Sequence, residues 1–221
     1  MRRSSIVVMT GIALVSVGLG PAGPAPAETA SAKAFIRDGI DRVLNILKKR
    51  DLDRTRKLVA LRRAFKRYFD HEFIARYAAG RYFRGASPVD KRLYVKTLED
   101  FLVHAYGSRM LVYSDEIDLK LKATDIFAIT RVTEPRPRYF IVHTHINRRI
   151  AEVVRINWHV RRTAGTYKVV DVVVMGISQA RRYRSDFAAV IQRRKRGLPG
   201  LTSALRAKVD AYRRDAARRV R

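Results

Sequence analysis

The stretch "AEVVRINWHVRRTAGTYKVVDVVV", residues 151–174, decides the fold class of this chain of 221 residues. Apolar and polar residues alternate in its first half, which is typical of a strand with one buried face. The apolar face of that strand carries Val154, Ile156, Trp158 and Val160. Ala164 and Gly165 then predict a tight turn, after which the chain returns through a run of valines. The stretch therefore predicts two long antiparallel strands.

Further strands are expected before this hairpin. "EIDLKLKA", residues 116–123, alternates between apolar and polar residues, and "TDIFAITRVTE", residues 124–134, is rich in residues that favour strands. "YFIVHTHI", residues 139–146, has the same character. "EPRPR", residues 134–138, predicts a turn or an edge position, because proline cannot donate a hydrogen bond to a strand neighbour. We expect an antiparallel sheet of four or five strands.

Helices are predicted on both sides of the sheet in the sequence. Apolar residues recur every three or four positions from Ser31, a plausible helix cap, and again from about Asp53. Ser87 and Asp90 form a capping box that predicts a third helix. Residues 192–221 combine many basic residues with an apolar stripe and predict an amphipathic helix that frays into a basic tail. The fold class is therefore α+β, with helices packed on an antiparallel sheet.

The beginning of the chain has the pattern of an export signal. Arg2 and Arg3 are followed by the apolar run Ile6–Gly20, which is short for a membrane span, and by the small residues Ala25–Ala27. This pattern predicts a cleaved signal peptide over residues 1–27. An uncleaved membrane anchor is the alternative, although glycine and proline residues interrupt the apolar run.

The charge of the chain indicates an anionic partner. It has 47 Lys and Arg residues against 20 Asp and Glu residues, a net charge of +27, and no cysteine for disulfides or thiolate metal sites. Without residues 1–27, 45 basic residues face 20 acidic residues. Because an exported protein rarely meets nucleic acid, we expect an anionic membrane surface as a partner and no nucleic acid.

Three patterns could carry chemistry. Ser178 lies in "GISQA", which resembles the nucleophile elbow of serine hydrolases, but all five histidines precede it, whereas that fold requires the histidine after the serine. We expect Ser178 to be a helix cap. His143 and His145, two positions apart, could bind a metal together with Asp171, but the sequence fixes no third ligand and we predict no metal site. Acid–base enzyme chemistry on the same fold is a further alternative.

Large apolar residues crowd both the helices and one face of the sheet. Phe65, Tyr68, Phe69 and Phe73 follow one another closely in the helical part, and Val142 adds to the apolar sheet face. These residues could form an ordinary core or line a cavity. Periodicity alone does not distinguish the two.

Two long segments resemble the MlaC family of periplasmic phospholipid carriers, also called toluene-tolerance auxiliary proteins of an ABC transporter. The first is "FDHEFIARYAAGRYFRGASPVDKRLYVKTLEDFLVHAYGSRM", residues 69–110, and the second is "YKVVDVVVMGISQARRYRSDFAAVIQR", residues 167–193. They occur in the family's order and span much of the chain after residue 27. At Met175 the sequence departs from the acidic residue expected in many relatives.

The resemblance implies a curved antiparallel sheet of the nuclear-transport-factor type, with helices that enclose an apolar lipid pocket. It implies a domain of residues 28–200, followed by a basic C-terminal helix or tail of residues 201–221. The expected function is that of a periplasmic lipid carrier, without catalysis or cofactor. Such a carrier moves phospholipid between an inner-membrane ABC transporter complex and an outer-membrane lipoprotein complex. Because one branch of the family is associated with hopanoids, a hopanoid or another polycyclic lipid is the alternative ligand.

The resemblance also suggests which residues meet the lipid. Val170, Val172 and Val174 are expected in the pocket wall, with Gly176 and Ser178 in the turn that follows. The full set of predicted lipid-contacting residues is Tyr77, Phe83, Phe101, Leu102, Tyr106, Met110, Val142, Ile156, Trp158, Val172 and Val174. Arg181, Arg182 and Arg184 are candidates for contact with an anionic headgroup or a partner, the alternative being a solvated helix face.

Overall fold

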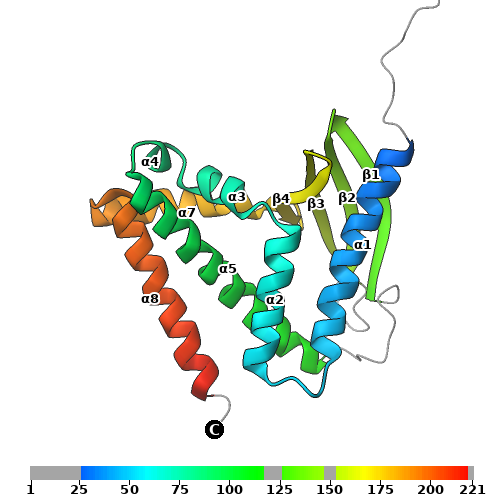
Figure 1. Cartoon of the computed structure of the whole chain (residues 1–221), viewed down its shortest axis with the longest axis horizontal. Coiled ribbons are helices and arrows are strands. Elements are labelled where there is room, and N and C mark those ends of the chain that lie inside the picture. Colours follow the sequence, from blue (N-terminus) through cyan, green and yellow to red (C-terminus); the bar gives the residue numbers. More distant parts are fainter. Residues whose placement is uncertain (1–25, 117–125, 147–152, 219–221) are drawn as a thin grey trace, which may run out of the picture.

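The computed structural model describes residues 26–116, 126–146 and 153–218 of the chain. These residues form seven helices and five strands, with most helices before the strands and two after them (Figure 1). The helices are α1 (Pro26–Lys48), α2 (Arg54–Tyr68), α3 (His71–Ala79), α4 (Arg81–Arg84), α5 (Pro88–Glu116), α7 (Gln179–Arg194) and α8 (Gly197–Arg218). The strands are β1 (Phe127–Arg136), β2 (Tyr139–Ile146), β3 (Val154–Thr163), β4 (Thr166–Val174) and β5 (Ile177–Ser178). The predicted α+β class is confirmed.

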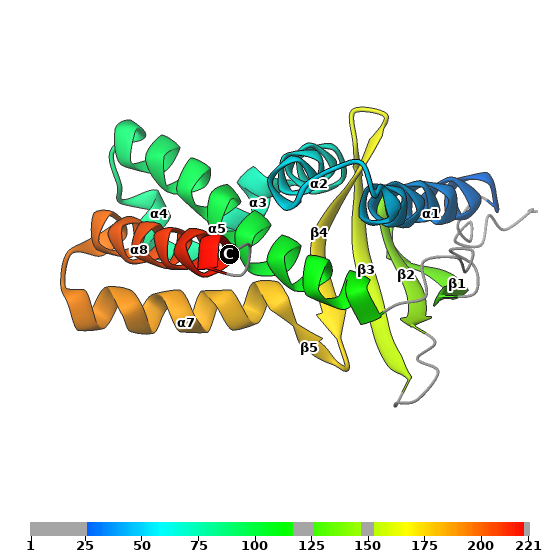
Figure 2. The ribbon, with the colours of Figure 1, turned by 90° about the horizontal axis from the view of Figure 1, so that it is seen from below.

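The sheet is an antiparallel meander in the order β1-β2-β3-β4-β5. Ala164 and Gly165 both have positive φ, 48° and 77°, which is the backbone of the tight hairpin turn predicted between β3 and β4. Met175 and Gly176, with φ of 49° and 84°, form a second such turn that returns the chain into β5. The short β5 then leads directly into α7 (Figure 2).

A β-bulge in β4 explains why two successive valines, Val169 and Val170, can both be buried. His159 of β3 pairs with Asp171, but the next residue, Val160, pairs with Val169 instead of Val170. A bulge places two residues of one strand opposite one residue of its partner and so breaks the alternation of faces. Val169 and Val170 are accordingly both buried.

Helix α1 packs along one face of the sheet, which we call the inner face (Figure 2). Its buried residues form one cluster with strand residues: Ala32, Ile36, Ile40 and Leu44 with Phe140, Val142, Val160 and Val169. The spacing of the four α1 residues is that of one helical face. Burial of this face stabilises α1 on β1 and β2.

A second core holds the helical part of the molecule together, on the side away from α1 (Figures 1 and 2). It combines residues of α3, α5, α7 and α8, among them Tyr94 and Leu98, which are almost fully buried. The apolar stripe predicted for the C-terminal helix is present, since Leu201, Leu205 and Val209 are all buried in this core. Helix α8 packs mainly against α5.

Two of the three predicted helix starts are confirmed. The Asp53 side chain accepts a hydrogen bond from the Arg56 amide at 2.8 Å, and the Ser87 hydroxyl accepts one from the Asp90 amide at 3.1 Å. The start at Ser31 is wrong, because α1 begins at Pro26 and the Ser31 hydroxyl donates to a carbonyl within the helix. Proline suits the first turn of a helix, which accounts for the earlier start.

The strand expected to begin at residue 116 is wrong at its first residue. Helix α5 continues to Glu116, and Leu111 near its end is buried against Leu47 and Leu61 of the neighbouring helices. This contact stabilises the last turns of α5 against the weak local strand pattern. The rest of the expected strand at residues 116–123 lies outside the described residues.

Candidate functional site

The inner face continues beyond the part that α1 covers. Strand register places Val142 opposite Trp158 and Trp158 opposite Val172. It likewise places Thr144 opposite Ile156 and Ile156 opposite Val174. We call this end of the inner face the distal patch: Thr144, Ile156, Trp158, Val172 and Val174. Side chains that are directly paired across antiparallel strands share a face, so four apolar residues predicted to contact lipid lie side by side.

The polar atoms of the distal patch are satisfied within the sheet. The indole nitrogen of Trp158 donates to the Thr144 hydroxyl at 3.0 Å, and that hydroxyl donates to the carbonyl of Ile156 at 3.0 Å. Because these groups need no outside partner, and because Thr144 and Ile156 are themselves buried, the half-buried Trp158, Val172 and Val174 present mainly hydrocarbon. Such a surface suits an apolar ligand and offers no reactive group.

Helix α5 approaches the same end of the sheet through Tyr106. Its hydroxyl lies 3.3 Å from the Oε1 atom of Gln179, the first residue of α7, directly after β5. It also accepts a hydrogen bond from the Tyr183 hydroxyl at 2.9 Å. Burial is the main cause that raises the pKa of Tyr183, so this phenol remains protonated at neutral pH. The bonds connect α5, α7 and the end of the sheet next to Val174.

Exposed apolar side chains occur in the chain segments next to β3, β4 and β5 and in the last turns of α5. Met110, one turn beyond Tyr106 on α5, is 38% exposed, and Ile177, the cross-strand partner of Val174, is 58% exposed. Val112, Val153 and Met175 are also large apolar residues that remain exposed. We call these five residues the apolar rim. Apolar exposure gathered next to an apolar face is typical of a ligand-binding or interaction surface.

Val142 is buried between α1 and the sheet, and four further predicted lipid-contacting residues lie in the helical part of the molecule. Phe101 and Leu102 are buried there, and Phe101 meets the Tyr183 ring edge-on at a centroid distance of 5.9 Å. Phe83 packs against Tyr94, and Tyr77 stacks on a neighbouring aromatic ring of α3. Of this group, Phe101 reaches the region of Tyr106 through its contact with Tyr183. Tyr77 and Phe83 are not brought to the distal patch.

The three candidate arginines of α7 have different environments. Arg184 donates to the carbonyl of Tyr77 at 3.1 Å, and its guanidinium lies over the Tyr77 ring at 5.2 Å. It therefore joins α7 to α3. Arg182 is exposed and lies 3.8 Å from the Asp186 carboxylate on the same helix. Arg181 is exposed next to the start of α7.

Ser178 is a helix cap, as predicted. Its hydroxyl accepts a hydrogen bond from the Arg181 amide at 3.1 Å and donates to the Asp171 carboxylate at 2.5 Å. Asp171 also accepts from the amides of Val172 and Ala180, at 2.8 and 2.9 Å. The Ser–Asp pair of the sequence motif therefore fixes the junction between β4 and α7. No histidine takes part in these bonds.

The histidines of the sheet lie on the outer face, away from the distal patch. His143 interacts with the Thr133 hydroxyl and the Asn157 side chain, and His159 with the Tyr139 hydroxyl at 2.8 Å. Burial lowers the pKa of both His143 and His159. Among residues 26–116, 126–146 and 153–218, no group of three or more potential ligands could hold a metal ion.

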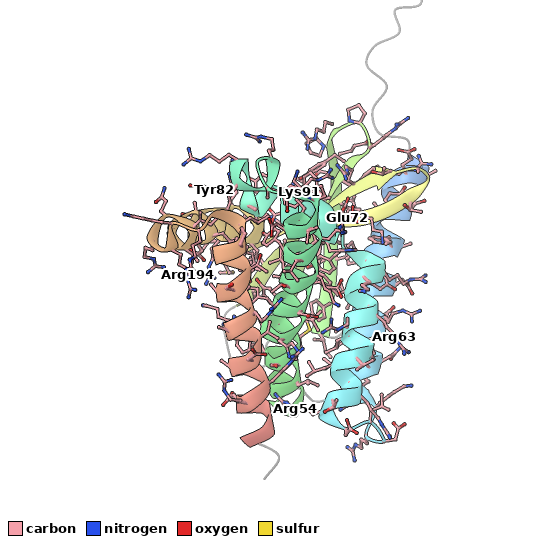
Figure 3. The ribbon with its side chains drawn as sticks, turned by 60° about the vertical axis from the view of Figure 1, so that its left-hand side comes forward. Arg54, Arg63, Glu72, Tyr82, Lys91 and Arg194 are labelled. Carbon is pink, nitrogen blue, oxygen red and sulfur yellow. The ribbon has the colours of Figure 1, made fainter. Side chains whose placement is uncertain are left out.

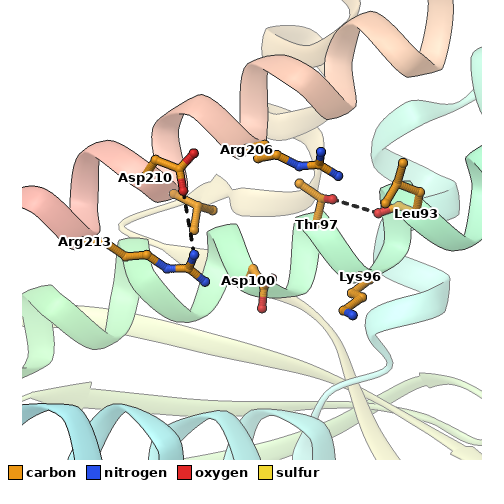
Figure 4. Close-up of a pocket in the computed structure, with 8 residues that line it drawn as sticks. Leu93, Lys96, Thr97, Asp100, Arg206, Asp210 and Arg213 are labelled. Carbon is orange, nitrogen blue, oxygen red and sulfur yellow. Dashed lines mark hydrogen bonds and ion pairs between the residues drawn. The ribbon is translucent and has the colours of Figure 1, made fainter.

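Two hollows of the surface lie between helices. The first, of about 210 Å³, is bounded by α5 and α8 and lined by Thr97, Asp100, Arg206 and Arg213, among others (Figure 4). The second, of about 510 Å³, lies between α2, α3 and α5 and is rich in cations. Of the predicted lipid-contacting residues, the second contains Phe83 and the first contains none.

Two contacts were not foreseen from the sequence although they involve its motifs. Asp70, which follows Phe69 in the first motif, forms an ion pair with Arg161 of β3 at 2.7 Å. Gly80, which ends α3 with φ 56° and ψ −125°, would place a Cβ atom 3.3 Å from the Arg184 guanidinium. Both residues lie in the first of the two motif segments, but only the fold brings each to its partner.

Together, the geometry defines an α+β protein in which helices pack on an open antiparallel sheet and leave an apolar patch at one end. The family model described as MlaC protein matches residues 37–207, so the chain belongs to the MlaC family. A comparison with curated proteins finds no match. Among the described residues, no helix is both long and apolar enough to cross a membrane.

A solved structure shares the fold. It is the phospholipid-binding protein from Ralstonia solanacearum in complex with a phospholipid, with 20% sequence identity and a TM-score of 0.68. The similarity covers 82% of this chain and 98% of that chain. At this identity the likeness establishes a common fold.

Proposed function

We propose that the protein is a periplasmic carrier of phospholipid. The observation that carries the proposal is its membership of the MlaC family over residues 37–207, supported by a structural neighbour that is a phospholipid-binding protein. The distal patch adds a physical reason, because its polar atoms are internally satisfied while its apolar atoms lie beside an exposed apolar rim.

We propose that the acyl tails lie against the distal patch, between β3, β4 and the C-terminal half of α5. A lipid with two tails carries roughly thirty methylenes, each worth about 0.8 kcal/mol when kept from water, so hydrophobic burial alone can hold it. Ile156, Trp158, Val172 and Val174 would form the sheet side of the site, and Tyr106 and Met110 the helix side. Arg181 is the candidate among the α7 arginines for the headgroup, because it is exposed and next to β5.

The route of the lipid is part of the proposal. Residues 1–27 would direct export and be removed, leaving a lipid-binding domain that begins at residue 28. The expected boundary at residue 200 would divide α8, whose Leu201, Leu205 and Val209 belong to the helical core, so the domain would include this helix and only the end of the chain would be a basic tail. The carrier would exchange lipid with an inner-membrane ABC transporter complex and an outer-membrane lipoprotein complex. A hopanoid is the alternative cargo, since a polycyclic hydrocarbon would suit the same apolar patch.

The test is the lipid content of the protein purified after export from its full-length precursor. Native mass spectrometry and solvent extraction should find about one bound lipid per chain, and the extract identifies it as phospholipid or hopanoid. An empty protein that also takes up no phospholipid from vesicles would contradict the proposal.

A further inference from the structure

The hollow between α2, α3 and α5 gathers cations from three helices. We call it the basic groove: Arg62 and Lys66 of α2, Arg76 of α3, and Lys91, Arg92 and Lys96 of α5 all line its volume of about 510 Å³. Glu72 and Glu99 are the acidic residues of the same lining. The groove therefore holds a clear excess of positive charge, even though concentrating like charges is unfavourable without a counter-charge.

The cations of α2 are paired with acids of α5. Glu99 has a side chain only 8% exposed and lies 3.3 Å from Lys66 and 3.5 Å from Arg62. Arg62 also pairs with Asp100. These pairs join α2 to α5 and neutralise part of the charge at the α2 side of the groove.

The cations on the α3 and α5 side have no such partner. Among the described residues, no carboxylate lies within ion-pair distance of Arg76, Arg92 or Lys96, and all three are exposed. Arg92 and Lys96 are one helical turn apart and so project from the same side of α5. Lys91 donates to a backbone carbonyl of α4 at 3.2 Å and lies over the Phe83 ring.

The arrangement of these cations suits a phosphate group, which has several acceptor oxygens, better than it suits a single carboxylate. Two guanidinium groups and an ammonium group around one hollow can donate several charge-assisted hydrogen bonds to the oxygens of one phosphate. Phe83 and Val95, in the same lining, offer apolar contact to the carbon atoms next to it. In Figure 3, Lys91 and Glu72 lie near each other beside the start of α5, while Arg194 lies at a distance on α7.

We propose that the basic groove binds the phosphate-bearing headgroups of anionic lipids at a membrane surface. This site differs from the distal patch in place and in chemistry, since its residues come from α2, α3, α4 and the first turns of α5. Its occupant would stay in the membrane, whereas the cargo lipid leaves with the carrier. The groove would hold the protein at the surface, where a net positive charge already attracts it.

Two double variants with equal charge change test the proposal. Arg92→Gln with Lys96→Gln alters the groove, and Lys33→Gln with Arg37→Gln alters a similar exposed pair, also one turn apart, on α1. Each removes two positive charges. Binding is measured by co-sedimentation with vesicles of phosphatidylcholine and phosphatidylglycerol, at a salt concentration of about 0.15 M where long-range attraction is screened.

The groove variant should bind these vesicles about tenfold more weakly than the unchanged protein, and the α1 variant should lose less than about twofold. Glu72→Gln should strengthen binding, because it removes the acidic residue of the groove that has no ion-pair partner among the described residues. Equal losses in the two double variants would assign binding to net charge alone and overturn the proposal. So would a Glu72→Gln variant that binds more weakly.

Two further probes separate the possible occupants. If soluble glycerol phosphate competes with vesicles for the protein, the groove recognises the phosphate of the headgroup. If glycerol phosphate binds the groove but the groove variant binds vesicles as well as the unchanged protein does, the groove is not a membrane site and the proposal is overturned. Poly-glutamate binding that the groove variant loses, with vesicle binding intact, would make the groove a protein docking site and also overturn it. Cargo lipid is extracted from each variant, and its loss from the groove variant would place these cations in the cargo site instead.

Discussion

Asp70 and Arg161 form an ion pair, with 2.7 Å between Oδ2 and Nη2, that joins the start of α3 to β3. Asp70 also caps α3 by accepting a hydrogen bond from the Phe73 amide at 3.0 Å. Its own amide donates to the carbonyl of Val169 in β4 at 2.9 Å. A single residue therefore holds the helical part of the molecule against two strands of the sheet.

Replacing Asp70 with alanine should lower the free energy of unfolding by about 2–4 kcal/mol, because it removes a helix cap worth about 1 kcal/mol and leaves a half-buried Arg161 without its partner. Urea denaturation followed by circular dichroism measures the change. Asp53→Ala is the matched control, since Asp53 caps α2 from an exposed position and its loss should cost only about 1 kcal/mol. Equal effects of the two substitutions would contradict the role of the ion pair.

Gly80 makes the backbone turn from α3 into α4 possible. Its φ of 56° and ψ of −125° lie in a region that glycine adopts and alanine avoids. Gly80→Ala should therefore lower the midpoint of thermal unfolding by several degrees, equivalent to roughly 1–3 kcal/mol. Gly85→Ala, at φ −80° and ψ −2°, should change stability little, because alanine adopts that backbone without strain. If Gly80→Ala leaves the midpoint of thermal unfolding unchanged, the turn can rearrange and the prediction is wrong.

His104 makes the stability depend on pH. It is buried on α5, and burial together with Arg213 and Arg62 lowers its pKa from the ordinary value of 6.5. The unfolded chain therefore takes up a proton at a higher pH than the folded protein does, so the free energy of unfolding falls as pH drops below about 6.5. The contribution of His104 to the free energy of unfolding is fully retained above that pH.

The measurement is a series of urea denaturations between about pH 8 and pH 5, a range that includes the ordinary histidine pKa. His104→Gln should show a shallower loss of stability on acidification than the unchanged protein, in which His143 and His159 add further dependence of the same sign. An identical pH profile for His104→Gln would contradict the assignment.

Local sequence patterns predicted the elements that depend on local chemistry. The helix start at about Asp53, the cap at Ser87 and the turn at Ala164–Gly165 are predicted correctly, because each depends on residues within three or four positions. The start of α1 and the end of α5 were wrong, since favourable helix residues and the burial of Leu111 extend both helices beyond their local signals.

The candidate site was predictable only where strand alternation fixes a face. Ile156, Trp158, Val172 and Val174 were grouped correctly on one face because β3 and β4 are joined by a tight hairpin. Tyr77 and Phe83 are separated from that face, since their place depends on how α3 and α4 pack against α5 and α7. Periodicity describes one element at a time, so it contains no information on this packing, nor on the basic groove between three helices.

The last prediction tests the distal patch as the place of the acyl tails. Ile156 and Arg155 are neighbours on β3 that project to opposite faces, so Ile156→Asp places a carboxylate in the patch and Arg155→Asp places one on the exposed outer face. An unpaired charge beside acyl chains costs several kcal/mol, so Ile156→Asp should reduce bound lipid at least tenfold, as should Val172→Asp. Arg155→Asp should retain it. Lipid is extracted from each purified protein and quantified by mass spectrometry, after circular dichroism has shown that the variant is folded. If folded Ile156→Asp and Val172→Asp proteins both keep the lipid content of the unchanged protein, the tails lie elsewhere, and the proposed site is wrong even if the protein is a lipid carrier.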